Sequence, residues 1–186
     1  MVFRSARFAA VVLALFAGST FAADAIKSGP QVGDKVPGPF HPLNINGEYA
    51  GKKNCLFCQN GNNPVAMIFA RNTDAATVDL IKQIDAATTK NSASKMGSFV
   101  VFLSDDKDLE GKLKEVAEKT GLKKCVLSID NPAGPKGYDV SQKADLTVVL
   151  YNERTVKANY SFTKGELTKS EISKIVSDVQ KIIPKD

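Results

Sequence analysis

Three short, continuous apolar runs, separated by segments with helical spacing, constrain the fold of this chain more than any other feature. The first run is 65–70 (VAMIFA), the second is 99–103 (FVVFL), and a shorter third run is 125–129. Runs without polar alternation are typical of strands that are buried on both faces of a parallel sheet. Strands joined through helices are parallel and connected by right-handed crossovers, so this order predicts an α/β sandwich.

The segments around these runs carry the end signals of helices. A helix capped by Asn72 or Thr73 is predicted after the first run, and a second helix over 104–121 follows the second run. The clearest helix lies within 168–184, because it opens with a capping box, continues as one apolar stripe and ends at a proline.

The remaining segments are predicted to be extended. Two strands, 146–151 and 155–162, are separated by a tight turn and form a predicted antiparallel hairpin. The stretch 25–53 is rich in turn residues, and Asn46-Gly47 within it is a candidate hairpin turn. The whole pattern predicts a central mixed five-stranded sheet flanked by helices, with an N-terminal extended or hairpin segment.

The first residues have the order of a secretory signal peptide. Arg4 and Arg7 form a short positive region, residues 8–17 form an apolar core, and small residues follow. The core is too short to span a bilayer as a permanent helix. Cleavage is expected after Ala22 or Ala25.

We therefore expect the mature protein to be exported, either to a periplasm or out of the cell. The chain then divides into a signal peptide (1–22), a mature N-terminal tail (23–32) and one folded domain (33–186). About 160 residues remain after cleavage, which is enough for one domain with its own hydrophobic core.

Charge and hydropathy exclude two classes of partner for the mature chain. The sequence has 25 Lys and Arg against 20 Asp and Glu, a net charge of +5 that falls to about +3 when the signal peptide leaves. The lysines alternate with acids and form no basic stripe with interleaved aromatics, so no nucleic acid is expected as a partner. No later apolar segment is long enough to cross a membrane, so we expect no membrane as a partner after the signal peptide is removed.

The chain has three cysteines, Cys55, Cys58 and Cys125. Because the number is odd, in an oxidising compartment one thiol stays free, pairs with another molecule or joins a metal site. The C-x-x-C spacing of the first two is used by redox dithiols, by metal half-sites and by small structural disulfides. His41, the only histidine, would complete a Cys3His set suited to zinc or Cu(I). Gln59 after Cys58 excludes covalent haem attachment, and no cofactor is predicted.

Several segments match one known superfamily. The segment 33–40 (GDKVPGPF) has a Gly-Asp, a Pro and a Phe ahead of the first predicted hairpin, and the stretch 126–140 has Asp130 at a strand end with Tyr138 beyond it. With the final hairpin and capped helix, the chain from residue 33 onward resembles the thioredoxin-like superfamily, in its peroxiredoxin and redoxin branch. The resemblance implies a thioredoxin-like sandwich.

The resemblance also implies a redox cysteine after the central strand, where the N-terminus of the next helix stabilises a thiolate. Here the residues after the run 65–70 are 71–76 (RNTDAA), and none is a cysteine. The peroxidatic Pro-x-x-x-Thr-x-x-Cys pattern is missing as well, and Leu146 stands where a cis-proline is implied. The usual site is therefore vacant, and peroxidase activity is not expected.

The C-x-x-C pair precedes the central strand, which predicts it at the opposite pole of the sheet. Residues 59–64 (QNGNNP) do not open a helix at once, so we expect the pair on a loop, without a helix dipole and less reactive than a thioredoxin dithiol. Cys125 begins the third parallel strand and is expected at the same pole. It is either a buried hydrophobe or a resolving thiol or third metal ligand.

Three functions remain open at this point. The first is thiol–disulfide exchange with a protein partner, in which one of Cys55 and Cys58 attacks and the other resolves the mixed disulfide. The second is a non-catalytic binding domain in which the pair is a structural disulfide. The third is metal binding by Cys55, Cys58 and Cys125, with or without His41. The fold alone does not decide among them.

Overall fold

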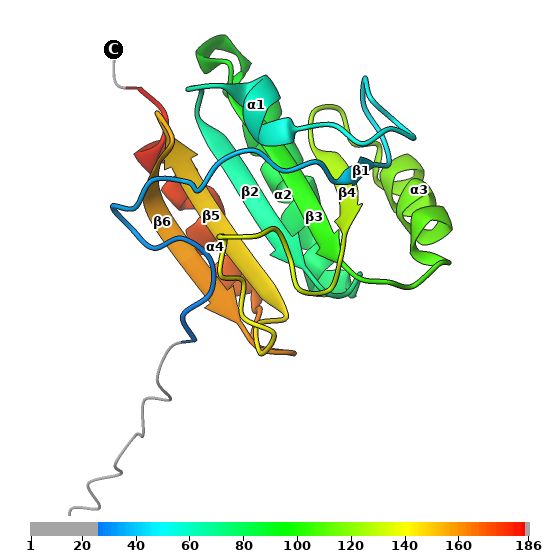
Figure 1. The fold of residues 1–186 in the computed structure, drawn as a ribbon. Helices are drawn as coiled ribbons and strands as arrows, with labels where there is room; N and C mark the ends of the chain where they lie inside the picture. Colours follow the sequence, from blue (N-terminus) through cyan, green and yellow to red (C-terminus); the bar gives the residue numbers. More distant parts are fainter. Residues whose placement is uncertain (1–25, 185–186) are drawn as a thin grey trace, which may run out of the picture.

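The computed structural model describes residues 26–184 (Figure 1). The predicted signal peptide and the first residues of the predicted tail lie outside the described residues. Within 26–184, no helix is both long enough and apolar enough to cross a membrane.

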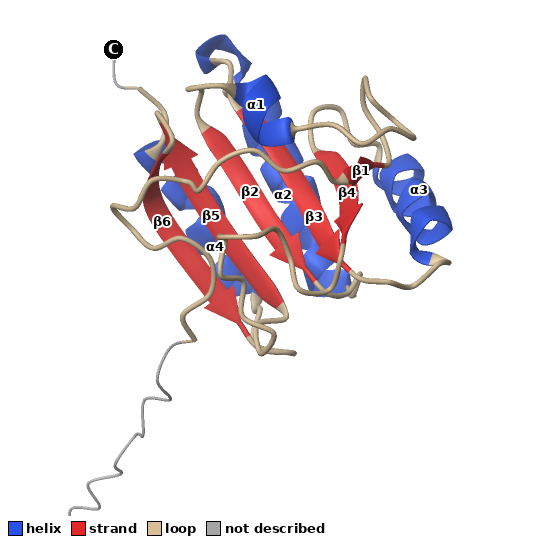
Figure 2. Ribbon diagram, in the orientation of Figure 1, coloured by secondary structure: helices blue, strands red, loops and turns tan. Residues whose placement is uncertain are grey.

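A mixed sheet forms the centre of the fold (Figure 2). The strands are β1 (Leu43–Asn44), β2 (Val65–Ala70), β3 (Gly97–Leu103), β4 (Val126–Asp130), β5 (Leu146–Asn152) and β6 (Thr155–Phe162). The helices are α1 (Leu56–Asn60), α2 (Ala75–Lys90), α3 (Leu109–Thr120) and α4 (Lys169–Asp178), with 3-10 turns at Ser92–Ser94 and Val179–Lys181. The strand order is β1-β4-β3-β2-β5-β6, in which β2, β3 and β4 are parallel and the other pairings are antiparallel.

The predicted sandwich with a mixed central sheet is confirmed, and the sheet has six strands rather than five. The additional strand, β1, comes from the N-terminal segment, where Leu43 pairs with Ile129 of β4 and also bridges to Lys53. The strands β2 and β6 have the predicted bounds.

Two predicted helix starts are wrong. The cap of α2 is Asp74, whose carboxylate accepts the N–H of Thr77 at 2.8 Å, while the side chain of Asn72 accepts the N–H of Asp74. The helix expected from residue 104 begins at Leu109, because the side chains of residues 104 and 106 bond backbone N–H groups two residues on and hold turns there. Short polar side chains compete with the helix for the backbone in this way.

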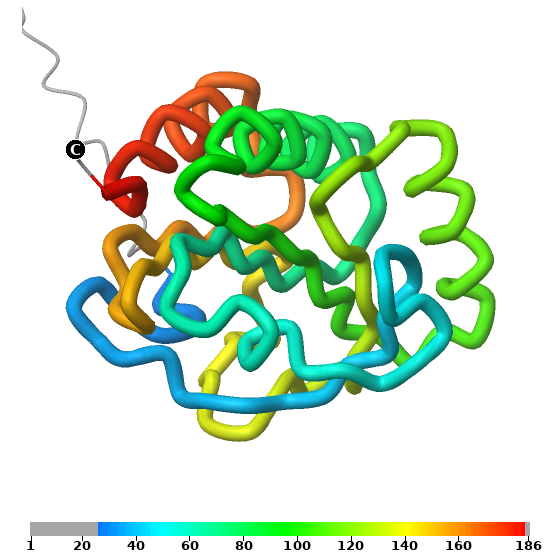
Figure 3. The backbone as a smooth tube through the Cα atoms, turned by 90° about the horizontal axis from the view of Figure 1, so that it is seen from above, coloured from blue at the N-terminus to red at the C-terminus, as the bar shows by residue number. Residues whose placement is uncertain are grey.

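Two hydrophobic clusters lie on the two faces of the sheet, and β2 contributes to both. Ala66, Ile68 and Ala70 pack into the cluster under α2 and α4, whereas the alternate residues of β2 pack into the other cluster. Figure 3 shows α2 and α4 together on one side of the sheet, with the N-terminal segment (blue) and the loop 131–145 (yellow) on the other. Because alternate residues of β2 are buried in apolar clusters on opposite faces of the sheet, this strand has no polar residue.

The end of the predicted tail lies against the sheet. The hydroxyl of Ser28, which is buried, is 2.7 Å from the hydroxyl of Thr147 on β5, and it accepts the N–H of Ser141. The side chain of Asn159 on β6 donates to the carbonyl of Ser28 at 2.9 Å. Residues 28–31 are therefore part of the folded structure.

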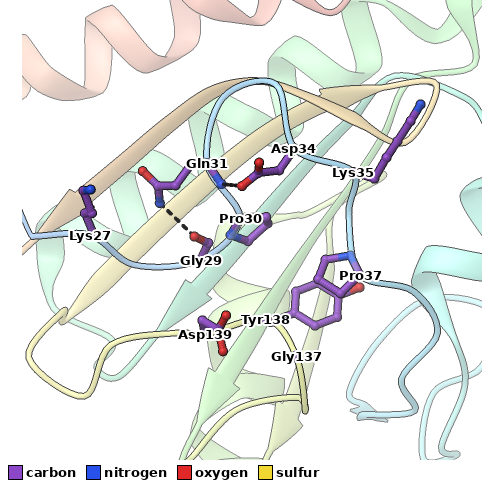
Figure 4. A pocket seen from close by; sticks show the side chains of 10 residues that line it. All are labelled: Lys27, Gly29, Pro30, Gln31, Asp34, Lys35, Pro37, Gly137, Tyr138 and Asp139. Carbon is purple, nitrogen blue, oxygen red and sulfur yellow. Dashed lines mark hydrogen bonds between the residues drawn. The ribbon is translucent and has the colours of Figure 1, made fainter.

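A surface hollow of about 520 Å³ lies where this segment meets the loop that carries Tyr138 (Figure 4). Its polar groups are largely used within the segment, since the N–H of Gln31 donates to Asp34 and the side chain of Gln31 donates to the carbonyl of Gly29. No cysteine or histidine lines it.

A buried carboxylate joins α2 to the start of β4. Asp85 accepts the backbone N–H groups of Lys123, Lys124 and Cys125, the last two at 2.7 Å. Only 7% of Asp85 is exposed. Hydrogen bonds to a charged acceptor are roughly twice as strong as neutral ones, so this contact sets where β4 begins.

We predict that Asp85→Ala lowers the free energy of unfolding by about 2–4 kcal/mol, because the N–H groups of the 123–125 segment lose their acceptor. Urea denaturation measures the loss. Asp79→Ala is the control on the same helix: its carboxylate bonds only the side chain of Gln83, so a loss below about 1 kcal/mol is expected. Equal losses in the two variants would contradict the role of Asp85.

Candidate functional site

The sheet has two poles with different chemistry. The amino pole is the edge at which β2, β3 and β4 begin and the β5–β6 hairpin turns, and the carboxyl pole is the edge at which those three strands end. The helix α1 lies at the amino pole, directly ahead of β2 (Figure 1). Cys55 and Cys58 lie there, at the pole that their sequence position predicts.

The two cysteines form a disulfide, with 5.2 Å between their Cα atoms. The expectation that they lie on a loop is wrong, because Cys55 is the N-cap of α1 and Cys58 lies within this helix. The following residues end the helix after about one turn: the side chain of Asn60 donates to the carbonyl of Leu56, and Gly61 follows at positive φ. Gly61 therefore ends a short helix and does not prevent that helix from forming.

The two sulfur atoms have unlike surroundings. Only 6% of Cys55 is exposed, whereas Cys58 lies at the surface. The backbone N–H of Cys58 donates to Sγ of Cys55 at 3.1 Å. A partner's thiol can therefore approach Cys58, and negative charge on the sulfur of Cys55 is stabilised by that N–H.

The apolar side of α1 is fixed in the core. Leu56 and Phe57, between the cysteines, are buried in the same cluster as Val65 and Met67 of β2. The polar end of the helix is fixed by a close approach to Gly97, since a Cβ built there would lie 1.8 Å from Oδ1 of Asn60. Glycine at the start of β3 thus makes room for the end of α1.

The turn between β5 and β6 also contacts α1. The N–H of Glu153 donates to the carbonyl of Asn62 at 3.1 Å. The guanidinium of Arg154 lies 5.1 Å from the ring centroid of Phe57, and its Nε donates to the carbonyl of Gly61 at 3.5 Å. Sequence reasoning missed Arg154, because only the antiparallel pairing of β5 with β2 brings it to the dithiol.

Cys125 lies at the amino pole, as predicted, but on the other face of the sheet. It belongs to the cluster under α2 and α4, whereas Cys55 belongs to the opposite cluster. It is a free thiol, 1% exposed, and burial raises its pKa to about 12. This burial fits the interpretation of Cys125 as a buried hydrophobic residue.

The metal hypothesis is not supported by this arrangement. In the part of the chain that the structure describes, no group of three or more His, Cys, Asp or Glu side chains is placed to hold a metal ion. His41 is exposed on the segment ahead of β1. The three cysteines and His41 therefore do not form the set that their ligand types suggested.

The carboxyl pole is closed where the resemblance implies a redox site. Arg71, directly after β2, donates to the carbonyls of Ala144, Pro132 and Ser141 at 3.0, 2.8 and 3.4 Å. Burial lowers the pKa of its guanidinium below the ordinary value. Because these carbonyls belong to the loop ahead of β5, Arg71 ties that loop across the position of the usual active site.

Comparisons with known proteins match the fold and not the sequence. No family model matches the chain, and no curated protein matches it. Among solved structures, a candidate protein disulfide isomerase from Bacteroides thetaiotaomicron is similar with a TM-score of 0.64 and 14% identity, over 86% of this chain and 96% of that one.

Two further structures extend this similarity. A candidate thiol:disulfide interchange protein DsbE from Chlorobium tepidum has a TM-score of 0.57 and 16% identity, over 80% of this chain and 98% of that one. The peroxidoxin BcpB from Mycobacterium tuberculosis has a TM-score of 0.57 and 14% identity, over 82% of this chain and 97% of that one. The chain therefore has a thioredoxin-like fold, and its structural neighbours include redoxin proteins of the branch that its sequence resembles.

Proposed function

We propose that this protein is exported and that it exchanges disulfides with a protein partner through Cys55 and Cys58. The observation that carries the proposal is the asymmetric disulfide on α1, in which Cys58 is exposed and Cys55 is buried with its sulfur bonded by a backbone N–H. The thioredoxin-like fold and the thiol–disulfide proteins among its neighbours support it. Export is inferred from the signal-peptide pattern at the N-terminus.

The surroundings of the two cysteines support different roles for them. A partner thiolate attacks Sγ of Cys58, a sulfur–sulfur bond forms between the partner and Cys58, and Sγ of Cys55 leaves as a thiolate that accepts the N–H of Cys58. A second partner thiolate then attacks its own sulfur in the mixed disulfide, and Cys58 leaves as a thiolate. The partner loses two electrons as its disulfide forms, and the Cys55–Cys58 pair gains them.

The reverse reaction uses the same atoms. The thiolate of Cys58 attacks a partner disulfide, and Cys55 resolves the mixed disulfide. The cysteine pair differs from a thioredoxin-type site in its position, because it lies at the amino pole of the sheet. The exposed sulfur is Cys58, the second of the two cysteines.

The alternative, a binding domain with a structural disulfide, is favoured by the closed carboxyl pole. The energetics of the disulfide argue against it. A cross-link of sequence separation 3 closes a very short loop, which in the chain-entropy treatment contributes only about 2 kcal/mol. The core packing of Phe57 and the approach of Asn60 to Gly97 already hold α1 in place.

We predict that Cys55→Ser forms a stable mixed disulfide with oxidised glutathione, because exposed Cys58 remains and the resolving thiol is gone. Cys58→Ser leaves only buried thiols, Cys55 and Cys125, so its adduct should form at least tenfold more slowly. Mass spectrometry of the intact variants at timed intervals measures both rates. Equal rates, or no adduct in Cys55→Ser, would contradict the assigned roles.

A second prediction concerns Cys125. With a pKa of about 12, on the order of one Cys125 thiol in ten thousand is ionised at pH 8, and the thiolate is the reactive form. Ellman's reagent should therefore titrate no thiol in the folded, oxidised protein at pH 8 and one thiol after unfolding in guanidinium. Rapid reaction of one thiol in the folded protein would restore Cys125 as a candidate resolving thiol.

A further inference from the structure

The turn between β5 and β6 has a backbone conformation that its residues do not favour. Glu153 and Arg154 are at φ of 51° and 59°, both in the left-handed region. Two-residue hairpin turns of this kind are usually built from Asn-Gly or similar pairs, which adopt positive φ at little cost. The chain has a glutamate and an arginine there, so their side chains or contacts offset a backbone cost.

The contacts of Arg154 are directed at α1. Its guanidinium covers the ring of Phe57, the residue ahead of Cys58, and its Nε bonds the carbonyl of Gly61. The N–H of Gly61 in turn donates to the carbonyl of Cys58 at 3.2 Å. The positive charge therefore lies against the residue ahead of Cys58 and beside the glycine that ends α1.

No acid of the described residues forms an ion pair with Arg154. Among residues 26–184, every ion pair joins other side chains, and Nη1 and Nη2 of Arg154 have no hydrogen-bond acceptor. A second cation lies on the far side of the turn, where Nζ of Lys35 bonds the carbonyl of Glu153 and the hydroxyl of Thr155. Within residues 26–184, the side chain of Lys35 has no hydrogen bond or ion pair to α1.

We propose that Arg154 is a positioning residue for the Cys55–Cys58 couple, holding α1 through Phe57 and Gly61 and stabilising the reduced pair by its charge. This rests on the proposed redox role of the dithiol. Reduction of the disulfide adds two electrons and one proton, giving one thiolate and one thiol. The disulfide is neutral, so a nearby guanidinium stabilises the reduced form selectively and raises the reduction potential.

The experiment compares the reduction equilibria of three single variants with that of the wild type. Arg154→Met keeps the length and the apolar contact with Phe57 but removes the charge, and Arg154→Lys keeps the charge. Lys157→Met is the matched control, because it removes one exposed positive charge from β6 at a residue whose side chain has no hydrogen bond or ion pair to α1 among the described residues. Each protein is equilibrated with dithiothreitol buffers of graded ratio, and the reduced fraction is read by alkylation and mass spectrometry.

We expect Arg154→Met to shift the equilibrium three- to tenfold toward the disulfide, which is a potential about 14–30 mV more negative. Arg154→Lys and Lys157→Met should stay within twofold of the wild type. The inference is overturned if Arg154→Met also stays within twofold, or if Lys157→Met shifts as far as Arg154→Met. Loss of fold alone moves the unfolding free energy and is recognised by urea denaturation of the oxidised variants.

Hydrogen exchange provides a second readout that does not depend on turnover. Amides of residues 56–61 should exchange faster in oxidised Arg154→Met than in oxidised Lys157→Met, because the hydrogen bond to the carbonyl of Gly61 is lost. Absence of a mixed disulfide in Cys55→Ser would sink the proposed function. The difference between Arg154→Met and the wild type in dithiothreitol buffers would still decide the role of Arg154.

Discussion

The burial of β2 on both faces is the constraint on which the rest of the structure depends. All six of its residues, Val65–Ala70, are at most 1% exposed. Burying a Val, Met, Ile or Phe side chain contributes about 1.5–3 kcal/mol, and β2 places such side chains in two separate clusters. One cluster requires α2 and α4, and the other requires α1 together with the N-terminal segment. The layers of the fold follow from this division.

The position of the dithiol follows from the same strand. Because α1 directly precedes β2, its cysteines lie where β2 begins, and the antiparallel pairing of Val65 with Tyr151 brings the β5–β6 turn beside them. At the other end of β2, Arg71 bonds three loop carbonyls where a redoxin-type cysteine is implied. The sheet therefore has the Cys55–Cys58 disulfide at its amino pole and the hydrogen bonds of Arg71 to the loop at its carboxyl pole.

The parts of the fold that could be predicted are those with a local signal. The bounds of β2 and β6 follow from apolar patterning, and Thr168 caps α4 through the N–H of Glu171 as the capping box indicates. Helix starts were less predictable, because several neighbouring polar side chains compete for the same backbone N–H groups. The single turn of α1 was missed, since five residues carry no periodicity.

The candidate site shows the same division between local and distant determinants. The pole of the cysteines could be predicted from strand order alone. The face of Cys125 could not, because it depends on Asp85, 40 residues away, which holds the start of β4 under α2. Arg154 lies 96 residues after Cys58, and no sequence pattern joins them; their proximity is a product of strand register.

The central claim is that Cys55 and Cys58 form a redox couple and not a structural disulfide. The most direct measurement is equilibration of the wild-type protein with glutathione buffers, with the state of the pair read by alkylation and mass spectrometry. A redox couple is predicted to reach a mixture of dithiol and disulfide at potentials between about −180 and −260 mV. A pair that stays fully oxidised across that range, as a structural disulfide below about −300 mV does, would contradict the account.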